Sequence, residues 1–360
     1  MSKFHPLRIA RVDRETRDAI AVTFDVPDAM REQFRYAQGQ HLTLRATIGG
    51  QDIRRSYSIC AGVEDDRLRV AIKRSPGGVF SVWANEHLKA GETLDVMPPL
   101  GHFNVPLDAT SRRHSVAFAA GSGIAPILSI IKTTLAREPR AQFTLFYGNR
   151  ASANVMFREE LAALKDTNMQ RFNLVHVLSR EAQDIDLLHG RIDGPRAGAL
   201  LDHWAPMPDV DVVFLCGPDG MMQSIHAMLT ARGYPESSIK VERFASSIPK
   251  HEHRPSMLPQ GSASETEVTV ILDGATRCFT LDRTTENILD AGLRQGIELP
   301  YSCKGGVCST CRCRLLSGEV DMDVNFALED YEVERGFILA CQSYPATDKV
   351  TVDFDQSGMG

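Results

Sequence analysis

The sequence predicts a multidomain protein in which an antiparallel β-barrel precedes a doubly wound α/β domain and a small third domain. Three observations predict this order. Short segments rich in β-forming residues come first, alternating strand and helix patterns follow, and a compact cysteine motif lies in the last hundred residues. A chain of 360 residues is long enough for two or three hydrophobic cores. We expect domains at residues 1–108, 109–246 and 265–360, with a linker at 247–264 that is rich in Pro and Ser.

The barrel is predicted from five short segments of strand character. Glycine-rich and proline-rich turns separate them, which is typical of a small antiparallel barrel. One helix is expected from Val79 to Leu88, directly after the pair Gly77-Gly78. The expected strands are Ile9 to Val12, Ala19 to Val26, His41 to Ala46, Leu68 to Lys73 and Thr93 to Met97.

Two pieces of this barrel have groups suited to a nucleotide cofactor. Arg55 and Tyr57 share one face of an extended strand while Ser58 points to the other face. Gly78 and Ser81 offer backbone N–H groups and a hydroxyl at a helix start, which suits a pyrophosphate. Each piece alone is a weak signal, and a run such as Arg55-Ser56-Tyr57-Ser58 is more often an ordinary strand, so the interpretation depends on their combination.

The second domain begins with a continuous apolar run, Ser115 to Ala120, of the kind that a parallel strand covered on both faces requires. The motif Gly121-Ser122-Gly123-Ile124-Ala125-Pro126 follows, and then a helical pattern of isoleucines. Strand, glycine turn and helix is the context that a phosphate-binding loop needs. The motif is G-x-G-x-x-P and departs from the G-x-G-x-x-G of Rossmann dehydrogenases.

Three more strand patterns end in polar or glycine-rich clusters. Phe143 to Tyr147 ends before Arg150, with a helix expected from Val155 to Leu164, and Phe172 to Leu178 ends at Ser179. Val210 to Leu215 ends at Cys216-Gly217-Pro218-Asp219-Gly220-Met221, which opens a helix to about Arg232. In a doubly wound sheet the ligand binds at the carboxyl ends of the strands, where all these clusters are expected.

The C-terminal cysteines have the spacing C-x4-C-x2-C followed by a distant fourth cysteine. Cys303, Cys308, Cys311 and Cys341 therefore have the plant-type arrangement for a [2Fe–2S] cluster. Structural zinc is the alternative, but zinc modules usually pair two short C-x2-C hooks. Cys313 fits no position of the pattern; it is either a structural thiol beside the cluster or an alternative ligand.

Composition excludes several classes of function. The chain has no apolar run of about twenty residues and no basic stripe, so neither a membrane span nor a nucleic-acid partner is expected. Four of the eight cysteines are used by the motif and the rest are scattered, which favours the cytoplasm. Residues 261–360 carry 17 acidic and 8 basic residues, whereas the rest of the chain is slightly basic. This asymmetry indicates either electrostatic steering of a partner or solubility.

Taken together, these motifs resemble the ferredoxin–NADP⁺ reductase superfamily, and the last hundred residues resemble plant-type ferredoxins with a β-grasp fold. The resemblance implies FAD in the barrel, with Tyr57 on the isoalloxazine, Ser58 near its N5, and Arg55, Gly78 and Ser81 at the pyrophosphate. It implies that Phe244 packs near the flavin, although an ordinary core phenylalanine is the alternative. It further implies a nucleotide loop and a nicotinamide-side cluster formed by Gly121, Gly123, Pro126, Cys216, Gly217, Pro218 and Met221.

NADPH is the expected nucleotide and NADH the alternative. The 2′-phosphate of NADPH requires cations and hydroxyls, and Ser179 and Arg180 stand where similar reductases bind it. Arg150 and Arg191 are expected to assist, and Glu181 follows closely.

The cofactors together imply an electron path from NADPH through FAD to the [2Fe–2S] cluster. A flavin accepts both electrons of a hydride and releases them singly, whereas the cluster accepts one. Several stretches resemble the reductase components of phenylacetyl-CoA epoxidases: Gly39 to Leu44, Arg54 to Cys60, Met97 to Phe103, Tyr147 to Arg150, Leu187 to Gly194, Cys303 to Cys308 and Val352 to Asp355. The resemblance covers essentially the whole chain and implies a separate di-iron oxygenase as partner in aerobic phenylacetate degradation. Two alternatives remain: an NADH-dependent reductase of another ring- or steroid-hydroxylating oxygenase, and a non-catalytic iron–sulfur redox sensor.

Overall fold

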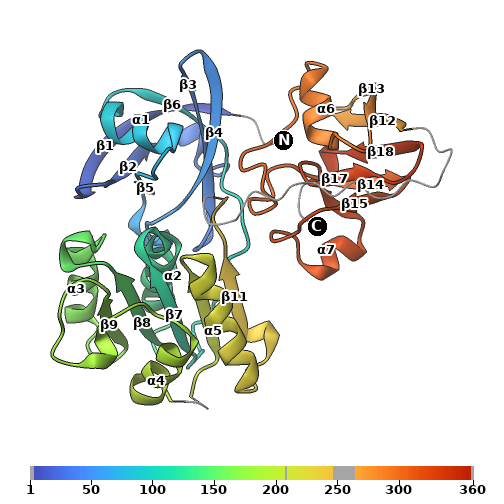
Figure 1. Cartoon of the computed structure of the whole chain (residues 1–360). Helices are drawn as coiled ribbons and strands as arrows, with labels where there is room; N and C mark the ends of the chain where they lie inside the picture. Colours follow the sequence, from blue (N-terminus) through green and yellow to red (C-terminus); the bar gives the residue numbers. More distant parts are fainter. Residues whose placement is uncertain (1–3, 207–208, 246–263, 358–360) are drawn as a thin grey trace. The chain divides into compact units, whose positions relative to one another are not determined.

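The computed structural model describes residues 4–206, 209–245 and 264–357. It forms two compact units, one with the barrel and the parallel sheet and the other with the C-terminal sheet (Figure 1). The predicted linker at 247–264, with His251 and His253, lies outside the described residues except for residue 264. Within the described ranges, no helix has the length and apolar character needed to cross a membrane.

The N-terminal sheet has six antiparallel strands, as predicted for a barrel. Ile59 forms a β-bridge to Val70, so the two strands at the edges of this sheet are joined to each other. Helix α1 (Val79–His87) buries Phe80 and Ala84 in the barrel core. The predicted strands are present, and the strand that includes Arg55 and Tyr57 adds a sixth. The order is β4 (Gln51–Ser58), β3 (His41–Ile48), β6 (Thr93–Val96), β1 (His5–Thr16), β2 (Ala19–Asp25) and β5 (Leu68–Lys73).

Strands β2 and β5 are buried on both faces because they belong to two cores. Ile20 and Val22 point into the barrel. Ala19 and Ala21 lie instead in the core that covers one face of the parallel sheet. Small side chains on this outer wall allow the neighbouring helix to approach closely, so barrel and parallel sheet share one continuous apolar contact.

The parallel sheet has five strands with helices on both faces, as a doubly wound domain requires. Helices α2 (Ile124–Arg137) and α3 (Arg158–Thr167) contribute to one core, and α4 (Gly194–Trp204) and α5 (Asp219–Ala231) to the other. The strand order is β11 (Ile239–Glu242), β10 (Val212–Cys216), β7 (His114–Ala120), β8 (Gln142–Asn149) and β9 (Phe172–Leu178).

Two helices of this domain differ from the prediction. Helix α3 begins at Arg158 and not at Val155, because Phe157 has a left-handed φ of 58° and its N–H donates to Glu15 at 3.2 Å. Helix α4 was not predicted, although its start has a clear signal. The Asp193 side chain accepts a hydrogen bond from the N–H of Arg196, and proline lies in the first turn.

The C-terminal unit is a mixed sheet crossed by a short helix, consistent with the predicted β-grasp fold. Asp273 and Gly274, both with positive φ, form the tight turn expected between its first two strands. Helix α6 (Ile288–Arg294) begins after Asn287, two residues later than predicted. Helix α7 (Asp330–Glu334) was not predicted. The sheet order is β13 (Ala275–Asp282), β12 (Glu265–Leu272), β18 (Lys349–Asp353), β14 (Arg312–Ser317) and β16 (Phe337–Leu339), with a separate pair β15 (Val320–Met322) and β17 (Ser343–Pro345).

Candidate functional site

The predicted flavin strand is β4, and its side chains alternate as expected. Ser58 is 4% exposed, whereas Tyr57 is half-buried and Arg55 exposed. The Tyr57 ring lies 5.6 Å from the ring of Phe80 on α1, tilted by 40°. This contact joins the end of β4 to the helix that follows the glycine pair, so the two predicted flavin-binding pieces lie side by side.

The turn before α1 depends on Gly78 and Ser81. A Cβ on Gly78 would lie 2.6 Å from the Ser81 hydroxyl, which accepts a hydrogen bond from the Ser75 N–H at 3.1 Å. No side chain caps the start of α1, so backbone N–H groups at this end are available to an anion. An open groove of about 390 Å³ runs along the same helix, lined by Gly77, Gly78, Val79, Val82, Trp83, Glu86, His87 and Ile48.

The predicted glycine loop and the Cys216 cluster meet at the ends of β7 and β10. A Cβ on Gly123 would lie 2.1 Å from the carbonyl oxygen of Cys216, so only glycine fits there. Gly217 in turn lies against Ala120 and Met221. The two motifs, far apart in sequence, therefore form one site.

Cys216 is fully buried, and burial, reinforced by the nearby Glu242, raises the pKa of its thiol well above the usual value. The thiol is therefore neutral near pH 7 and suited to packing beside a ring. Pro126 is buried in α2, Pro218 precedes α5, and Phe244 is partly buried against the core shared by barrel and sheet.

The cationic cluster expected for a 2′-phosphate lies at the ends of β8 and β9. The Arg180 N–H donates to the Arg150 carbonyl at 2.7 Å, so these two exposed arginines are neighbours. The Ser179 N–H likewise donates to the Asn149 carbonyl. Arg191 lies two residues after His189, which forms a β-bridge to Leu178 at the end of β9.

Glu181 is held away from a nucleotide-binding role by Ser152. Its carboxylate accepts hydrogen bonds from the Ser152 N–H at 2.8 Å and from the Ser152 hydroxyl at 2.5 Å. These bonds lower the pKa of Glu181, and the bond from the hydroxyl has the largest effect. The acid that follows Arg180 is thus occupied within its own loop.

The four predicted cluster ligands meet as two pairs of thiols. Cys303 donates to Cys308, which lowers the pKa of Cys308 to about 6, and Cys311 donates to Cys341, which lowers the pKa of Cys341. The pKa values of the donating thiols, Cys303 and Cys311, are raised correspondingly. Within the described ranges no three acidic, His or Cys side chains surround one point for a single metal ion. Four cysteine thiolates are the ligand set of a [2Fe–2S] cluster.

The cysteine loop donates N–H groups toward its sulfurs. The Gly305 N–H lies 3.3 Å from the Cys303 sulfur, and the Gln342 amide lies 3.5 Å from the Cys341 sulfur. Lys304, Gly306 and Ser309 all have positive φ, which turns the chain repeatedly around the site. The donor set and its N–H partners therefore fit a [2Fe–2S] cluster.

Cys313 is the cysteine of this region that fits no position of the motif. It is fully buried in the core of the C-terminal unit, and burial raises the pKa of its thiol. The same core contains Cys311 and Cys341, so Cys313 lies beside the predicted cluster site.

Two residues near the nucleotide loops were missed from the sequence. The Lys73 ammonium lies 3.7 Å from where a Cβ on Gly121 would be, so a cation from the barrel faces the glycine loop. The Tyr147 hydroxyl donates to the Gly121 carbonyl at 2.9 Å. Their signal was position: Lys73 ends β5 and Tyr147 is near the end of β8, where ligands of such sheets bind.

Three protein families match consecutive parts of the chain. Residues 6–105 match the oxidoreductase FAD-binding domain, residues 118–227 the oxidoreductase NAD-binding domain, and residues 270–346 the 2Fe-2S iron-sulfur cluster binding domain.

Relatives match the chain over nearly its full length. It is 46% identical over 359 residues to a subunit of the 1,2-phenylacetyl-CoA epoxidase of Escherichia coli (strain K12), with 100% of both chains covered. It is 36% identical to the ferredoxin reductase component of 3-ketosteroid-9-alpha-monooxygenase of Mycobacterium tuberculosis (strain ATCC 25618 / H37Rv), covering 97% of this chain and 96% of the relative.

Solved structures share the fold. Phthalate dioxygenase reductase matches with a TM-score of 0.57 at 23% identity, covering 98% of each chain. An intact type IV self-sufficient cytochrome P450 monooxygenase matches with a TM-score of 0.68 at 22% identity, covering 97% of this chain and 41% of that one.

Proposed function

This chain belongs to the ferredoxin–NADP⁺ reductase-type oxygenase reductases, which pass electrons from a pyridine nucleotide through FAD to a [2Fe–2S] cluster, and we propose that it is the NADPH-dependent reductase of a phenylacetyl-CoA epoxidase. The observation that carries this proposal is the 46% identity to the epoxidase chain of Escherichia coli over the whole of both proteins. The partner would then be a di-iron oxygenase of aerobic phenylacetate degradation. The non-catalytic sensor considered from the sequence is set aside, because FAD-binding and NAD-binding families match the first two thirds of the chain.

The residues of this chain would divide the work between three sites. Tyr57 and Ser58 would face the flavin ring, while the start of α1 at Gly78 and Ser81 would bind the pyrophosphate with Arg55. The glycine loop with Cys216 would hold the nicotinamide half of the nucleotide, and the two thiol pairs would hold the cluster. When bound, FAD supplies the conversion of one hydride into two single electrons.

The preference for NADPH is supported by the charge at the ends of β8 and β9. Arg150 and Arg180 are neighbours and exposed, and no hydrogen bond or ion pair of their side chains is found among the described residues. Guanidinium groups suit a phosphate that NADH does not have. With Glu181 bonded to Ser152, that carboxylate does not compete for the ribose hydroxyls.

The cellular setting is part of the proposal. None of the eight cysteines forms a disulfide bond in the structure, and a cluster with cysteine ligands needs reduced thiols when it is assembled. We place the protein in the cytoplasm.

The test uses anaerobic reduction followed by coupling to purified oxygenases. The flavin band of the holoenzyme should bleach faster with NADPH than with NADH, and Arg180→Gln should lower kcat/KM for NADPH by about tenfold or more while leaving the NADH value nearly unchanged. Oxidation of NADPH coupled to epoxidation of phenylacetyl-CoA would support a phenylacetyl-CoA epoxidase as the partner. Coupling to a steroid hydroxylase and not to the epoxidase would contradict it.

A further inference from the structure

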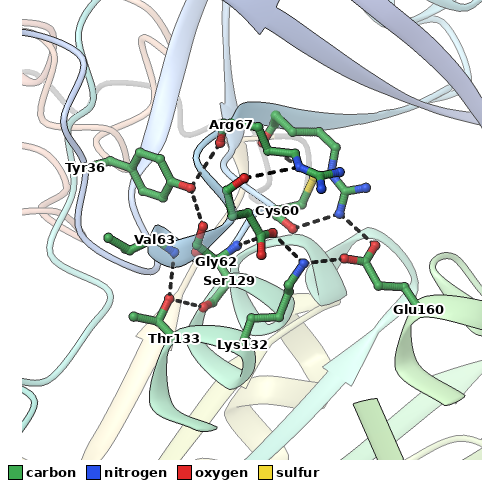
Figure 2. A network of polar contacts seen from close by, with 11 residues as sticks. Tyr36, Cys60, Gly62, Val63, Arg67, Ser129, Lys132, Thr133 and Glu160 are labelled. Carbon is green, nitrogen blue, oxygen red and sulfur yellow. Dashed lines mark hydrogen bonds and ion pairs between the residues drawn. The ribbon is translucent and has the colours of Figure 1, made fainter. Parts of the chain in front are cut away.

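Four charged side chains form an alternating chain where the barrel meets helices α2 and α3. Figure 2 labels two of them, Lys132 and Glu160. The Lys132 ammonium lies 2.6 Å from Glu160 Oε1 and also pairs with Asp65, while Arg69 Nη2 lies 2.7 Å from Glu160 Oε2. Asp65 and Arg69 belong to the barrel, and Lys132 and Glu160 to the nucleotide-binding domain. We call these four residues the charge latch.

The latch also holds the backbone of the barrel segment 60–69. Arg69 donates to the Cys60 carbonyl at 3.2 Å, and Asp65 accepts from the Gly62 N–H at 3.0 Å. From the helix side, the Thr133 hydroxyl accepts from the Val63 N–H at 3.1 Å. From the barrel side, the Tyr36 hydroxyl donates to the Gly62 carbonyl at 2.7 Å (Figure 2). Segment 60–69 is thus bonded from both domains.

This segment connects the two elements that carry the predicted flavin contacts. It begins two residues after Ser58. Its last two residues are the start of β5, which leads to Lys73 and then to the glycine pair before α1. Helix α2 begins at Ile124, directly after the glycine loop. The latch therefore joins the flavin strand to the helix that positions the nucleotide loop.

The fit between segment and helix is close. A Cβ on Gly62 would lie 2.8 Å from the Lys132 Cβ, and the Arg69 guanidinium lies 5.2 Å from the centre of the Phe157 ring. The exposed fraction of the latch side chains is 6% for Arg69, 15% for Lys132, 18% for Asp65 and 26% for Glu160.

Stability alone does not account for four charges at this depth. Removing ions from water is costly, and apolar residues of similar volume at such positions are often as stable or more so. Charged groups with fixed partners instead define how two surfaces are aligned with each other, which we call their register. On the barrel side, the apolar part of the same interface includes the short side chains of Ala19, Ala21 and Ala71.

We propose that Asp65, Arg69, Lys132 and Glu160 are positioning residues for hydride transfer, because they set the nicotinamide loop in register with the flavin strand. In that reaction a C–H bond of the reduced nucleotide breaks as an N–H bond forms on the flavin, so two electrons pass between them. The latch touches neither reactant and acts through segment 60–69 and α2. This inference rests on the reductase function but not on the choice of NADPH or NADH.

The experiment compares Lys132→Met with Lys132→Arg, in the holoenzyme without oxygen. Lys132→Met should lower the limiting rate of flavin reduction by about tenfold or more, since small misplacements of reacting groups are costly. The half-saturating nucleotide concentration should change much less, and the long-wavelength charge-transfer absorbance of the nucleotide–flavin complex should weaken. FAD content, cluster content and reduction by dithionite should be unchanged, and Lys132→Arg should restore most of the rate.

Asp202→Asn is the matched control, because it breaks the Asp202–Arg232 pair inside the nucleotide-binding domain. It should leave the limiting rate as in the wild type. If Lys132→Met loses FAD, Thr133→Val decides, since it removes the acceptor of the Val63 N–H, together with a bond to the Ser129 carbonyl inside α2. An unchanged limiting rate and an unchanged charge-transfer band in the FAD-containing variants would overturn the proposed positioning role of the latch. A wild type that neither nucleotide reduces would instead overturn the reductase function.

Discussion

Gly123 and Cys216 meet so closely that their contact decides whether the nucleotide site can form. A methyl group on Gly123 would lie 2.1 Å from the Cys216 carbonyl oxygen and 2.6 Å from its carbon, both of them backbone atoms that cannot rotate away. Gly220, in the first turn of α5, has no heavy atom within 4 Å of the place where a methyl group would be added. The two glycines therefore form a matched pair for substitution.

We predict that Gly123→Ala displaces the glycine loop and lowers kcat/KM for the nucleotide by about a hundredfold, the scale expected for a misplaced reacting group. Steady-state reduction of ferricyanide at several nucleotide concentrations measures this kcat/KM. Gly220→Ala should retain nearly full activity and gain slightly in stability, because alanine favours a helix over glycine. Equal activities of the two variants would show that the close contact is not required.

His176 lies half-buried in β9 with its ring 5.9 Å from that of Tyr147. Burial, with a smaller effect of Arg158, lowers the pKa of its imidazole. As the pH falls through about 6.5, the unfolded chain therefore takes up a proton at this position before the folded chain does. Stability should fall with the pH through that range.

His176→Gln should reduce this pH dependence. The urea midpoint of unfolding, followed by tryptophan fluorescence at about pH 7.5 and about pH 5.5, on either side of the ordinary pKa of histidine, measures it. The loss between the two pH values should be smaller in the variant than in the wild type, while substitution of the exposed His189 should leave the loss unaltered. An equal loss in His176→Gln and wild type would contradict the assignment.

At the scale of elements, helix α7 is tied to the cluster strand by a buried ion pair. Arg312, directly after the predicted ligand Cys311, pairs with Glu332, and their side chains are 10% and 3% exposed. Glu332 also accepts from the Glu329 N–H at 3.0 Å, which fixes the start of α7. Loss of one partner leaves a charge buried without compensation.

We predict that Arg312→Met destabilises the cluster unit by roughly 3–5 kcal/mol. The denaturant midpoint for loss of visible cluster absorbance should fall accordingly. Arg294→Met, which breaks the more exposed pair with Glu286, should cost at most about 1 kcal/mol. Similar midpoints for both variants would indicate that the buried pair does not hold the unit together.

At the scale of the whole molecule, charge is unevenly distributed. Residues 261–360 have a net charge of −9, from 17 acidic and 8 basic residues, while the chain as a whole has −6. A negative cluster unit attracts a positively charged electron acceptor over a distance of about 8–10 Å, the range that salt at ordinary ionic strength leaves unscreened.

Electron transfer to a basic protein such as cytochrome c should therefore slow by about tenfold as the salt concentration rises from roughly 20 to roughly 500 mM. Stopped-flow reduction of cytochrome c at several salt concentrations measures this. Transfer to ferricyanide, an anion, should not slow under the same conditions. A rate to cytochrome c independent of salt would exclude steering by this surface.

The motifs that sequence reasoning identified share one property, which is that their chemistry lies within a few adjacent residues. The cysteine loop, the G-x-G-x-x-P turn and the hairpin at Asp273 and Gly274 each need particular residue types at short spacing, because local backbone geometry demands them. Elements without such a local requirement were harder to predict. Helix α3 starts late because of a distant contact between Phe157 and Glu15, and no local signal announces it.

The sequence by itself determined the three-part fold and the spacing of the cysteine motif and the glycine-rich loops, since spacing and backbone freedom are properties of short segments. Only the tertiary structure brought Gly123 against Cys216 and joined Asp65, Arg69, Lys132 and Glu160 into one latch. Along the chain those four look like ordinary surface charges on separate elements. Folding places them together because strand order and helix packing, which act over the whole domain, decide which surfaces meet.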